Sequence, residues 1–207
     1  MDVNYAPLVP HTRPRGSYHH GALREELLNA CVRLIEVEGI GAVSLRRVAR
    51  EAGVSPAAPY HHFADRAALL AAISVRGFEQ LTERLRAALA GREQPRAAVV
   101  SLARAYVTFA RERKGYFQLM FRPELSQPEK HPDARAAGDA AFAVLADVVA
   151  ELDSPDPEAL AVSLWAFAHG LAALALDGQL DHRGAELGTD ADMLTARAIR
   201  LLDSMLG

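Results

Sequence analysis

The helical spacing of apolar residues is the feature that most constrains the fold of this chain. From residue 20 onward, apolar side chains recur three and four positions apart, and the first such stripe contains Leu23, Leu27, Cys31, Leu34 and Ile35. No segment shows the alternation and the β-branched richness that are typical of a strand. The sequence therefore predicts an all-α fold.

Glycine, proline and capping residues divide this pattern into segments. Residues 39–41 end the first segment, Ser44 is expected to cap a short helix closed by Gly53, and Ser55 to cap a second short helix that ends near Phe63. Asp65 opens a long amphipathic helix that extends to about residue 91. The remaining predicted helices begin near Pro95, after Arg113, and near His131, Asp156 and Asp190.

These boundaries predict a small N-terminal bundle, residues 17–66, joined by the long helix to a larger bundle, residues 67–207. Residues 1–16 are too polar and irregular to pack, so a disordered arm is expected there. The net charge of −3 is uneven, since residues 1–66 carry eight Arg against seven Asp or Glu, and five of the eight His. This weak bias favours the N-terminal third as the part that meets a polyanion.

Cysteine and hydropathy patterns point to a reducing compartment. Cys31 is the only cysteine, which excludes an intrachain disulfide, and its place among leucines predicts a buried thiol. The first residues lack the apolar run of a signal peptide, and no stretch reaches the roughly 18 uncharged residues of a membrane span. A cytoplasmic protein with no membrane partner is expected.

The short helices have the spacing of a helix-turn-helix. A small residue, Ala49, is followed four positions later by Gly53, and then by a cap and a second helix. Such a unit presents the start of its second helix to the major groove of DNA. Pro56 suits a first helical position, whereas Pro59 removes a backbone donor, so a tight or 3₁₀-like start is predicted. The small residues 57–58 would let backbone and base edges approach closely.

The segment SLRRVAREAGVSPAAPYHHFADRAALL, residues 44–70, combines Gly53, Val54, Tyr60, Phe63 and the pair 65–66 at one spacing. With its flanks, residues 22–72, it resembles the DNA-binding domain of TetR/AcrR-family transcriptional regulators. The resemblance implies phosphate contacts from Ser44, Tyr60 and Arg66, and base or backbone contacts from Arg46, Ala57, Ala58 and His61. The predicted DNA-binding set is Ser44, Arg46, Ser55, Pro56, Ala57, Ala58, Pro59, Tyr60, His61 and Arg66.

The chain departs from the family's commoner pattern just before the tyrosine. There the family has Lys-Gly-Thr-Leu, and residues 56–59 here read PAAP. The change removes a cation and a hydroxyl, so hydrogen bonds to bases are expected from Arg46 or His61 instead. Arg13 and Arg15 in the N-terminal arm could enter a minor groove, or the arm could be merely disordered.

Two clusters of large apolar residues predict a small-molecule site in the C-terminal bundle. One is aromatic and lies between residues 106 and 142; the other is SLWAFAHGLAALALDG, residues 163–178, where Trp165 and His169 share a helix face and Gly170 leaves room. The second stretch resembles the Trp-His-Gly C-terminal domain of one branch of the same family, which implies effector binding and dimerisation. The predicted ligand-binding set is Phe78, Tyr106, Phe109, Phe117, Met120, Phe121, Phe142, Trp165 and His169; core filling is the alternative for each.

Apolar faces on the last two helices predict a two-fold homodimer, with two DNA-reading helices on a palindromic double-stranded operator. The combined prediction is a ligand-responsive transcriptional regulator, a repressor released by a small apolar or aromatic effector. An activator of the same family and an effector-independent DNA-binding protein are the alternatives. An enzyme is not expected, because no phosphate loop, nucleophile elbow or HExxH run occurs. The adjacent histidine pairs 19–20 and 61–62 would point about 100° apart on a helix and chelate poorly, so neither a metal nor a cofactor is expected.

Overall fold

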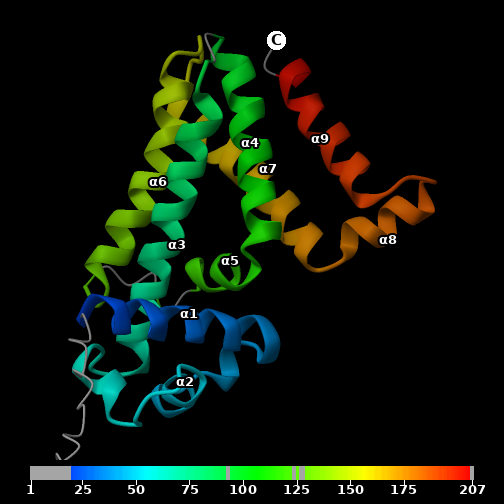
Figure 1. The fold of residues 1–207 in the computed structure, drawn as a ribbon. Coiled ribbons are helices and arrows are strands. Elements are labelled where there is room, and N and C mark those ends of the chain that lie inside the picture. Colours follow the sequence, from blue (N-terminus) through cyan, green and yellow to red (C-terminus); the bar gives the residue numbers. More distant parts are fainter. Residues whose placement is uncertain (1–19, 92–93, 123–124, 126–128, 206–207) are drawn as a thin grey trace, which may run out of the picture.

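The computed structural model describes residues 20–91, 94–122, 125 and 129–205. All regular secondary structure within these ranges is helical, as the apolar spacing predicts. A small bundle and a larger one share the long helix α3, which runs through both (Figure 1). The N-terminal arm, residues 1–16, lies outside the described residues.

The small bundle contains α1 (His20–Glu38), the 3₁₀ turn η1 (Ile40–Ala42), α2 (Leu45–Glu51) and the 3₁₀ turn η2 (Ala58–His61). The predicted cap of α2 is confirmed, since the Ser44 hydroxyl accepts a hydrogen bond of 3.2 Å from the Arg47 amide. Val48 and Ala49 turn inward and are fully buried against the core that α1 supplies. The short α2 is therefore held by packing rather than by its own helical propensity.

Helix α3 (Arg66–Leu89) belongs to both bundles. Its start is fixed by Asp65, whose carboxylate accepts a 2.8 Å hydrogen bond from the Ala68 amide. Leu69, Leu70 and Ile73, near the start of α3, are fully buried. The same apolar stripe continues upward inside the larger bundle, so one core runs without interruption from α1 to α9.

The larger bundle adds α4 (Pro95–Glu112), α5 (Lys114–Met120), α6 (Pro132–Ala150), α7 (Pro157–Leu176), α8 (Gln179–Glu186) and α9 (Ala191–Met205). The predicted starts of α4, α5, α6, α7 and α9 are confirmed, whereas α8 was missed because its glycine reads as a break. A Cβ at Gly184 would lie 2.9 Å from the Thr189 carbonyl oxygen. That glycine instead permits the tight junction between α8 and α9.

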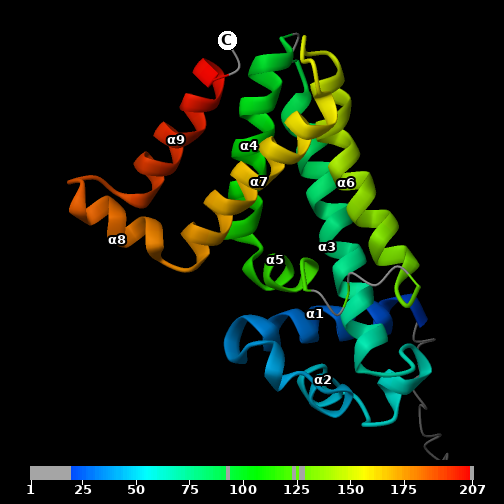
Figure 2. The same cartoon turned by 180° about the vertical axis from the view of Figure 1, so that it is seen from behind.

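Helix α3 packs on α6, α4 on α7, and α5 against α1, α3 and α4 (Figures 1 and 2). The hairpin of α8 and α9 extends away from the body, with α9 resting on α4. Within the described chain, α7 is long and apolar enough to cross a membrane by length and composition alone, with a mean hydropathy of 1.8 and 22% of that stretch buried. This corrects the expectation that no stretch reaches about 18 uncharged residues, since residues 159–176 carry no Asp, Glu, Lys or Arg. A core helix of a globular protein passes the same test of length and composition. Because only 22% of the stretch is buried, α7 leaves an apolar face uncovered.

Candidate nucleic-acid interface and ligand cavity

The turn after α2 has the geometry that a helix-turn-helix needs. Gly53 adopts φ +68°, in the left-handed region where residues with a Cβ are strained. The Val54 amide donates to the Ala49 carbonyl over 2.9 Å, and the Gly53 amide to the Arg50 carbonyl over 3.1 Å. These two bonds form a Schellman motif, which ends α2 and turns the chain sharply toward η2.

The second short element is a single 3₁₀ turn and not an α-helix. The Ala58 amide donates to the Ser55 carbonyl over 3.0 Å, and the Tyr60 amide to the Ala57 carbonyl over 3.2 Å. The predicted 3₁₀-like start is thereby confirmed, and Pro59 explains why the turn does not widen into an α-helix. The prediction that the Ser55 side chain caps this element is wrong, because Ala57 holds the cap position and no side chain bonds there.

Most of the predicted DNA-contacting residues lie at the surface around this turn. Ser55, Pro56, Ala57, Tyr60 and His61 are exposed, as are Ser44, Arg46 and Arg66, and Ala58 is half-buried. Pro59 is the exception, since it is among the most completely buried side chains of the described chain. Pro59 therefore cannot meet DNA, which corrects the prediction for this residue; its ring anchors the turn to the core.

Arg66 has a structural role that the sequence did not predict. Its Nε donates to the Val43 carbonyl over 3.0 Å and its Nη2 to the Ile40 carbonyl over 2.9 Å. These bonds join the start of α3 to the loop that precedes α2, so part of the guanidinium's hydrogen-bonding capacity is used inside the bundle. Only its remaining donors could reach a phosphate.

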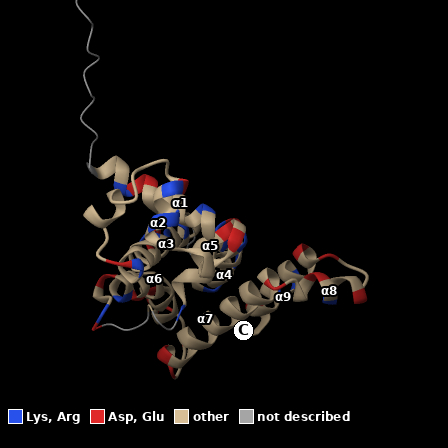
Figure 3. Cartoon of the chain, turned by 90° about the horizontal axis from the view of Figure 1, so that it is seen from below, with Lys and Arg blue, Asp and Glu red and all other residues tan. Residues whose placement is uncertain are grey.

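The exposed side of α2 carries two arginines without partners among the described residues, Arg46 and Arg50. They stand four positions apart and therefore share one face. Figure 3 views the molecule from this end, and its ribbon carries both basic and acidic positions along the helices of the small bundle. Arg47 nearby is paired with Glu38, which leaves Arg46 and Arg50 as the available cations. Arg50 was missed, although the apolar spacing of α2 already placed it opposite the core.

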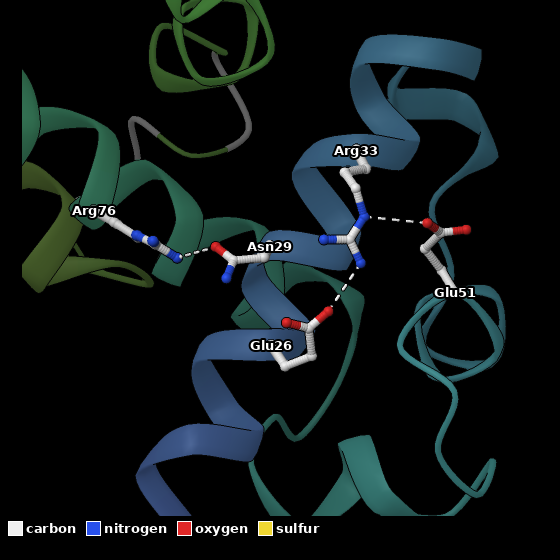
Figure 4. A network of polar contacts seen from close by, with 5 residues as sticks. All are labelled: Glu26, Asn29, Arg33, Glu51 and Arg76. Carbon is white, nitrogen blue, oxygen red and sulfur yellow. Dashed lines mark hydrogen bonds and ion pairs between the residues drawn. The ribbon is translucent and has the colours of Figure 1, made fainter.

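A polar network fixes α1 against its neighbours (Figure 4). Arg33 on α1 binds Glu26 over 2.9 Å and Glu51 of α2 over 3.2 Å, and these hydrogen bonds raise the pKa of Arg33. Arg76 on α3 donates to the Asn29 side chain over 2.8 Å. The network joins α1 to both α2 and α3 at the surface of the small bundle.

A cavity of about 380 Å³ lies in the larger bundle between α3, α4, α6 and α7. Its size falls within the range of small-molecule sites. Its wall is mostly apolar, and aromatic rings meet edge to face within it, such as Phe142 and Trp165 with centroids 5.9 Å apart. Six predicted ligand residues line it: Phe78, Tyr106, Met120, Phe121, Phe142 and Trp165.

Three predicted ligand residues do not line the cavity. Phe109 faces the core, fully buried, and Phe117 stacks on His169 with ring centroids 5.3 Å apart. The rings of Phe117 and His169 contact Tyr106, with centroids 5.7 and 6.2 Å from its own, but do not line the cavity. Helical spacing predicts the face of a residue and not its depth, so the sequence could not separate them from lining residues. The prediction of direct ligand contact is corrected for these three residues, which support the wall instead.

The hydroxyl of Tyr106 joins two side chains of α7. Trp165 Nε1 donates to it over 3.4 Å, and it lies 2.8 Å from His169 Nδ1. Since indole only donates, the Tyr106 hydroxyl accepts from Trp165, and its bond to His169 Nδ1 fits either neutral tautomer, because a hydroxyl both donates and accepts. Burial raises the pKa of Tyr106 and lowers that of His169, so both groups are neutral near pH 7.

The structure also reveals lining residues that the sequence did not single out. Ser74 belongs to the stripe 74, 78, 81 and 85 on α3, whose spacing alone could have identified it. Arg135 and Asp139 on α6 add a charged pair, joined over 2.8 Å. Aliphatic residues complete the wall, among them Val99, Leu102 and Leu145.

An exposed helix-turn-helix at one end of a bundle that holds an apolar cavity defines a DNA-binding transcriptional regulator. Comparisons agree with this class. Residues 27–73 match the model of bacterial regulatory proteins of the tetR family, and residues 99–202 match the Tetracyclin repressor-like C-terminal domain. The chain belongs to the TetR family of bacterial transcriptional regulators. The Trp-His-Gly subtype is not specifically confirmed.

The two curated relatives described below each match a little under half of the chain. The uncharacterized HTH-type transcriptional regulator YobS of Bacillus subtilis is 31% identical over 47% of this chain and 51% of its own length. The HTH-type transcriptional regulator BetI of Brucella anthropi is 35% identical over 43% of this chain and 47% of its own length. The chain thus spans about half the length of these curated relatives.

Solved structures match over nearly the whole chain. A protein of unknown function from Rhodococcus sp. RHA1 superimposes with a TM-score of 0.76 at 34% identity, covering 92% of this chain and 98% of its own. The TetR-family regulator PfmR from Thermus thermophilus superimposes with a TM-score of 0.66 at 20% identity, covering 85% and 96%. The second likeness extends to the fold alone.

Proposed function

We propose that this protein is a cytoplasmic, homodimeric repressor that binds a palindromic operator and is released by a small apolar or aromatic effector. The observation that carries the proposal is that α3 forms a wall of the cavity and is joined by Arg66 and Arg76 to the DNA-reading bundle. An effector-independent DNA-binding protein would not need a cavity of about 380 Å³.

The DNA contacts divide by chemistry. Arg46 and Arg50 supply unpaired cations. Tyr60 and His61 supply exposed rings that carry hydrogen-bonding groups. Arginine recognises guanine edges with two hydrogen bonds, whereas the small surface of residues 56–58 permits close approach to thymine methyl groups. Ser44 completes the set as a neutral phosphate contact.

The dimer contact is proposed on α7 and α9. Their outward faces carry large apolar side chains that the chain itself leaves uncovered, and such patches mark interaction surfaces. The exposed residues on these outward faces are Val162, Leu174, Met193, Leu201 and Met205. Two copies of this pair of helices form a four-helix interface, which sets the distance between the two DNA-reading units.

Signal transfer from the cavity is proposed to pass through α5. Met120 of α5 lines the cavity, and a Cβ at Gly115 would lie 2.7 Å from Glu36 Cγ of α1, so α5 touches both the ligand site and the DNA-binding bundle. The helical path is interrupted at Arg113, where α4 ends and α5 begins. An effector that prefers the wrongly spaced dimer lowers operator affinity by its differential affinity for that state.

The test is selection of DNA from a random pool with the purified protein, followed by fluorescence anisotropy on the selected duplex. A palindrome is expected. Arg46→Ala and Arg50→Ala should each weaken binding by about tenfold, in line with about 1–3 kcal/mol for a base-contacting arginine. Arg104→Ala is the matched control, because Arg104 is an exposed arginine on α4. Selection of no common sequence, or equal binding by all three variants, would rule the proposal out.

A further inference from the structure

Ser74 has an environment that no other described helical hydroxyl shares. It is 1% exposed, it lines the cavity, and its Oγ has no hydrogen-bond partner among the described residues. Several other serines and threonines of the described helices bond to a carbonyl of their own helix. They are Thr82, Ser101, Ser163, Thr195 and Ser204.

That difference indicates a site for a polar group. A buried hydroxyl without a partner is costly, and helical serines usually avoid the cost by bonding back to their own turn. Ser74 makes no such bond although the carbonyl of residue 70 stands one turn below it. Its hydrogen-bonding capacity is therefore available to whatever enters the cavity.

The polar groups of the cavity gather at one end. Ser74, Arg135 and Asp139 belong to the first halves of α3 and α6, which lie nearest the small bundle (Figure 1), and Tyr106 belongs to the second half of α4, which leads into α5. The opposite end is walled by aliphatic side chains. They are Leu85, Val99, Leu102, Leu145 and Leu202. Residues 74–85 of α3 rise by about 16 Å, so the cavity is longer than a single ring.

The charges of the wall cancel. Arg135 and Asp139 are paired with each other over 2.8 Å, and both are exposed toward solvent. Tyr106 and His169 are neutral. A carboxylate buried at Ser74 would find a hydroxyl but no unpaired cation, and burying an unpaired charge costs far more than burying a hydroxyl.

We propose that the cavity takes an elongated amphipathic molecule whose uncharged hydrogen-bonding head, a hydroxyl or carbonyl, binds Ser74 Oγ. Its apolar tail extends toward Leu85 and Leu202. This assignment rests on the proposed effector-binding function and names the chemistry of its ligand. It also places the polar head next to α5, on the side of the DNA-reading bundle.

The test uses Trp165, which lines the cavity and is the only tryptophan in the chain. Its fluorescence reports binding of three probes of matched shape: butylbenzene, 4-phenylbutan-1-ol and 4-phenylbutanoate. The alcohol should bind the wild-type protein more tightly than the other two. Ser74→Ala should weaken alcohol binding by about tenfold, the cost of about one buried hydrogen bond, and leave butylbenzene binding unchanged or tighter.

Ser101→Ala is the control, because the Ser101 hydroxyl already bonds to the Ala97 carbonyl over 2.9 Å. The melting temperature of unliganded Ser74→Ala should equal or exceed that of the wild type, since the substitution removes an unpaired buried hydroxyl. Equal alcohol affinity in wild type and Ser74→Ala would overturn the assignment of Ser74 while the effector site stands. Tighter binding of the carboxylate would overturn the uncharged head. No fluorescence response to any probe would overturn both the assignment and the effector site.

Discussion

At the scale of single residues, the backbone at Gly53 decides whether the DNA-reading turn can form. A residue with a Cβ is disfavoured at its φ of +68° by about 1–2 kcal/mol, although space around the position is open. Gly53→Ala should therefore lower the free energy of unfolding by about that amount in urea titrations. Gly41→Ala is the matched control, because Gly41 is exposed, has no positive φ and has no neighbour within 4 Å. Equal losses in both variants would contradict this account.

The burial of His169 makes stability depend on pH. Burial lowers the pKa of His169 below its ordinary value of 6.5, so the unfolded chain takes up a proton at a higher pH than the folded chain. The stabilisation is complete above pH 6.5 and is lost as the pH falls from there to the folded pKa. The melting temperature should fall between about pH 7 and pH 5 in the wild type and fall less in His169→Gln. Parallel curves for the two proteins would count against His169 as the group that titrates.

Burial protects the lone thiol. Desolvation raises the pKa of Cys31 to about 12, against a smaller opposing effect of the charge on Arg66. Since the thiolate is the reactive form, the folded protein should not react with a thiol-specific disulfide reagent at pH 8, and it should react fully in urea. Rapid reaction of the native protein would show that the α1 core opens.

Predictions for single residues succeeded where the helix face of a residue determines whether it lines the cavity. They failed where the depth of the side chain in the core determines it. Helical spacing identified Phe78, Tyr106 and Trp165 as cavity residues, but it could not tell Phe117, which lies behind the wall, from a lining residue. Pro59 was misplaced because a single 3₁₀ turn is too short to define an inner side in the sequence. Whether the charge of Arg66 faces DNA or the loop carbonyls is likewise set by tertiary contacts.

At the scale of elements, α5 is held very close to α3. A Cβ at Gly77 would lie 2.6 Å from Met120 Sδ and 3.2 Å from Tyr116 Cδ1. Gly77→Ala should therefore displace α5 and destabilise the protein by about 1–3 kcal/mol, the usual cost of overpacking. Because Met120 lines the cavity, the displacement should also weaken butylbenzene binding as measured by Trp165 fluorescence. Gly21→Ala, which has no neighbour within 4 Å, should leave both properties almost unchanged.

Element boundaries followed from capping chemistry more reliably than from glycine. Ser44, Asp65 and Asp156 each accept a backbone hydrogen bond at the helix start that the sequence had assigned to them. Gly184 led to the wrong boundary because a glycine can either end a helix or let two backbones approach closely. The sequence does not distinguish these two roles. The helix α8 around it could be recognised only once its junction with α9 was visible.

At the scale of the whole molecule, an all-helical chain with two bundles was predictable, and the continuity between the bundles was not. One apolar core joins α1 to α9, so the cavity and the DNA-reading turn are parts of a single packed body. Because α3 and α5 both pack on α1, we expect a ligand that shifts either helix to act on α1 as well. In the proposed dimer, the uncovered faces of α7 and α9 would determine how that shift reaches the second half of an operator.

The dimer proposal makes the most direct prediction at this scale. Leu174 is 45% and Leu201 is 60% exposed, and a two-fold interface places each of them in the contact twice. The double variant Leu174→Glu with Leu201→Glu should therefore be monomeric by light scattering. Its affinity for the selected palindrome should fall by at least about a hundredfold, since each half-site is then bound alone. Val37→Glu is the control, because Val37 is 83% exposed on α1, away from these helices. A double variant that stays dimeric would place the interface elsewhere on the molecule, and an unchanged affinity would mean that one copy reads the operator by itself.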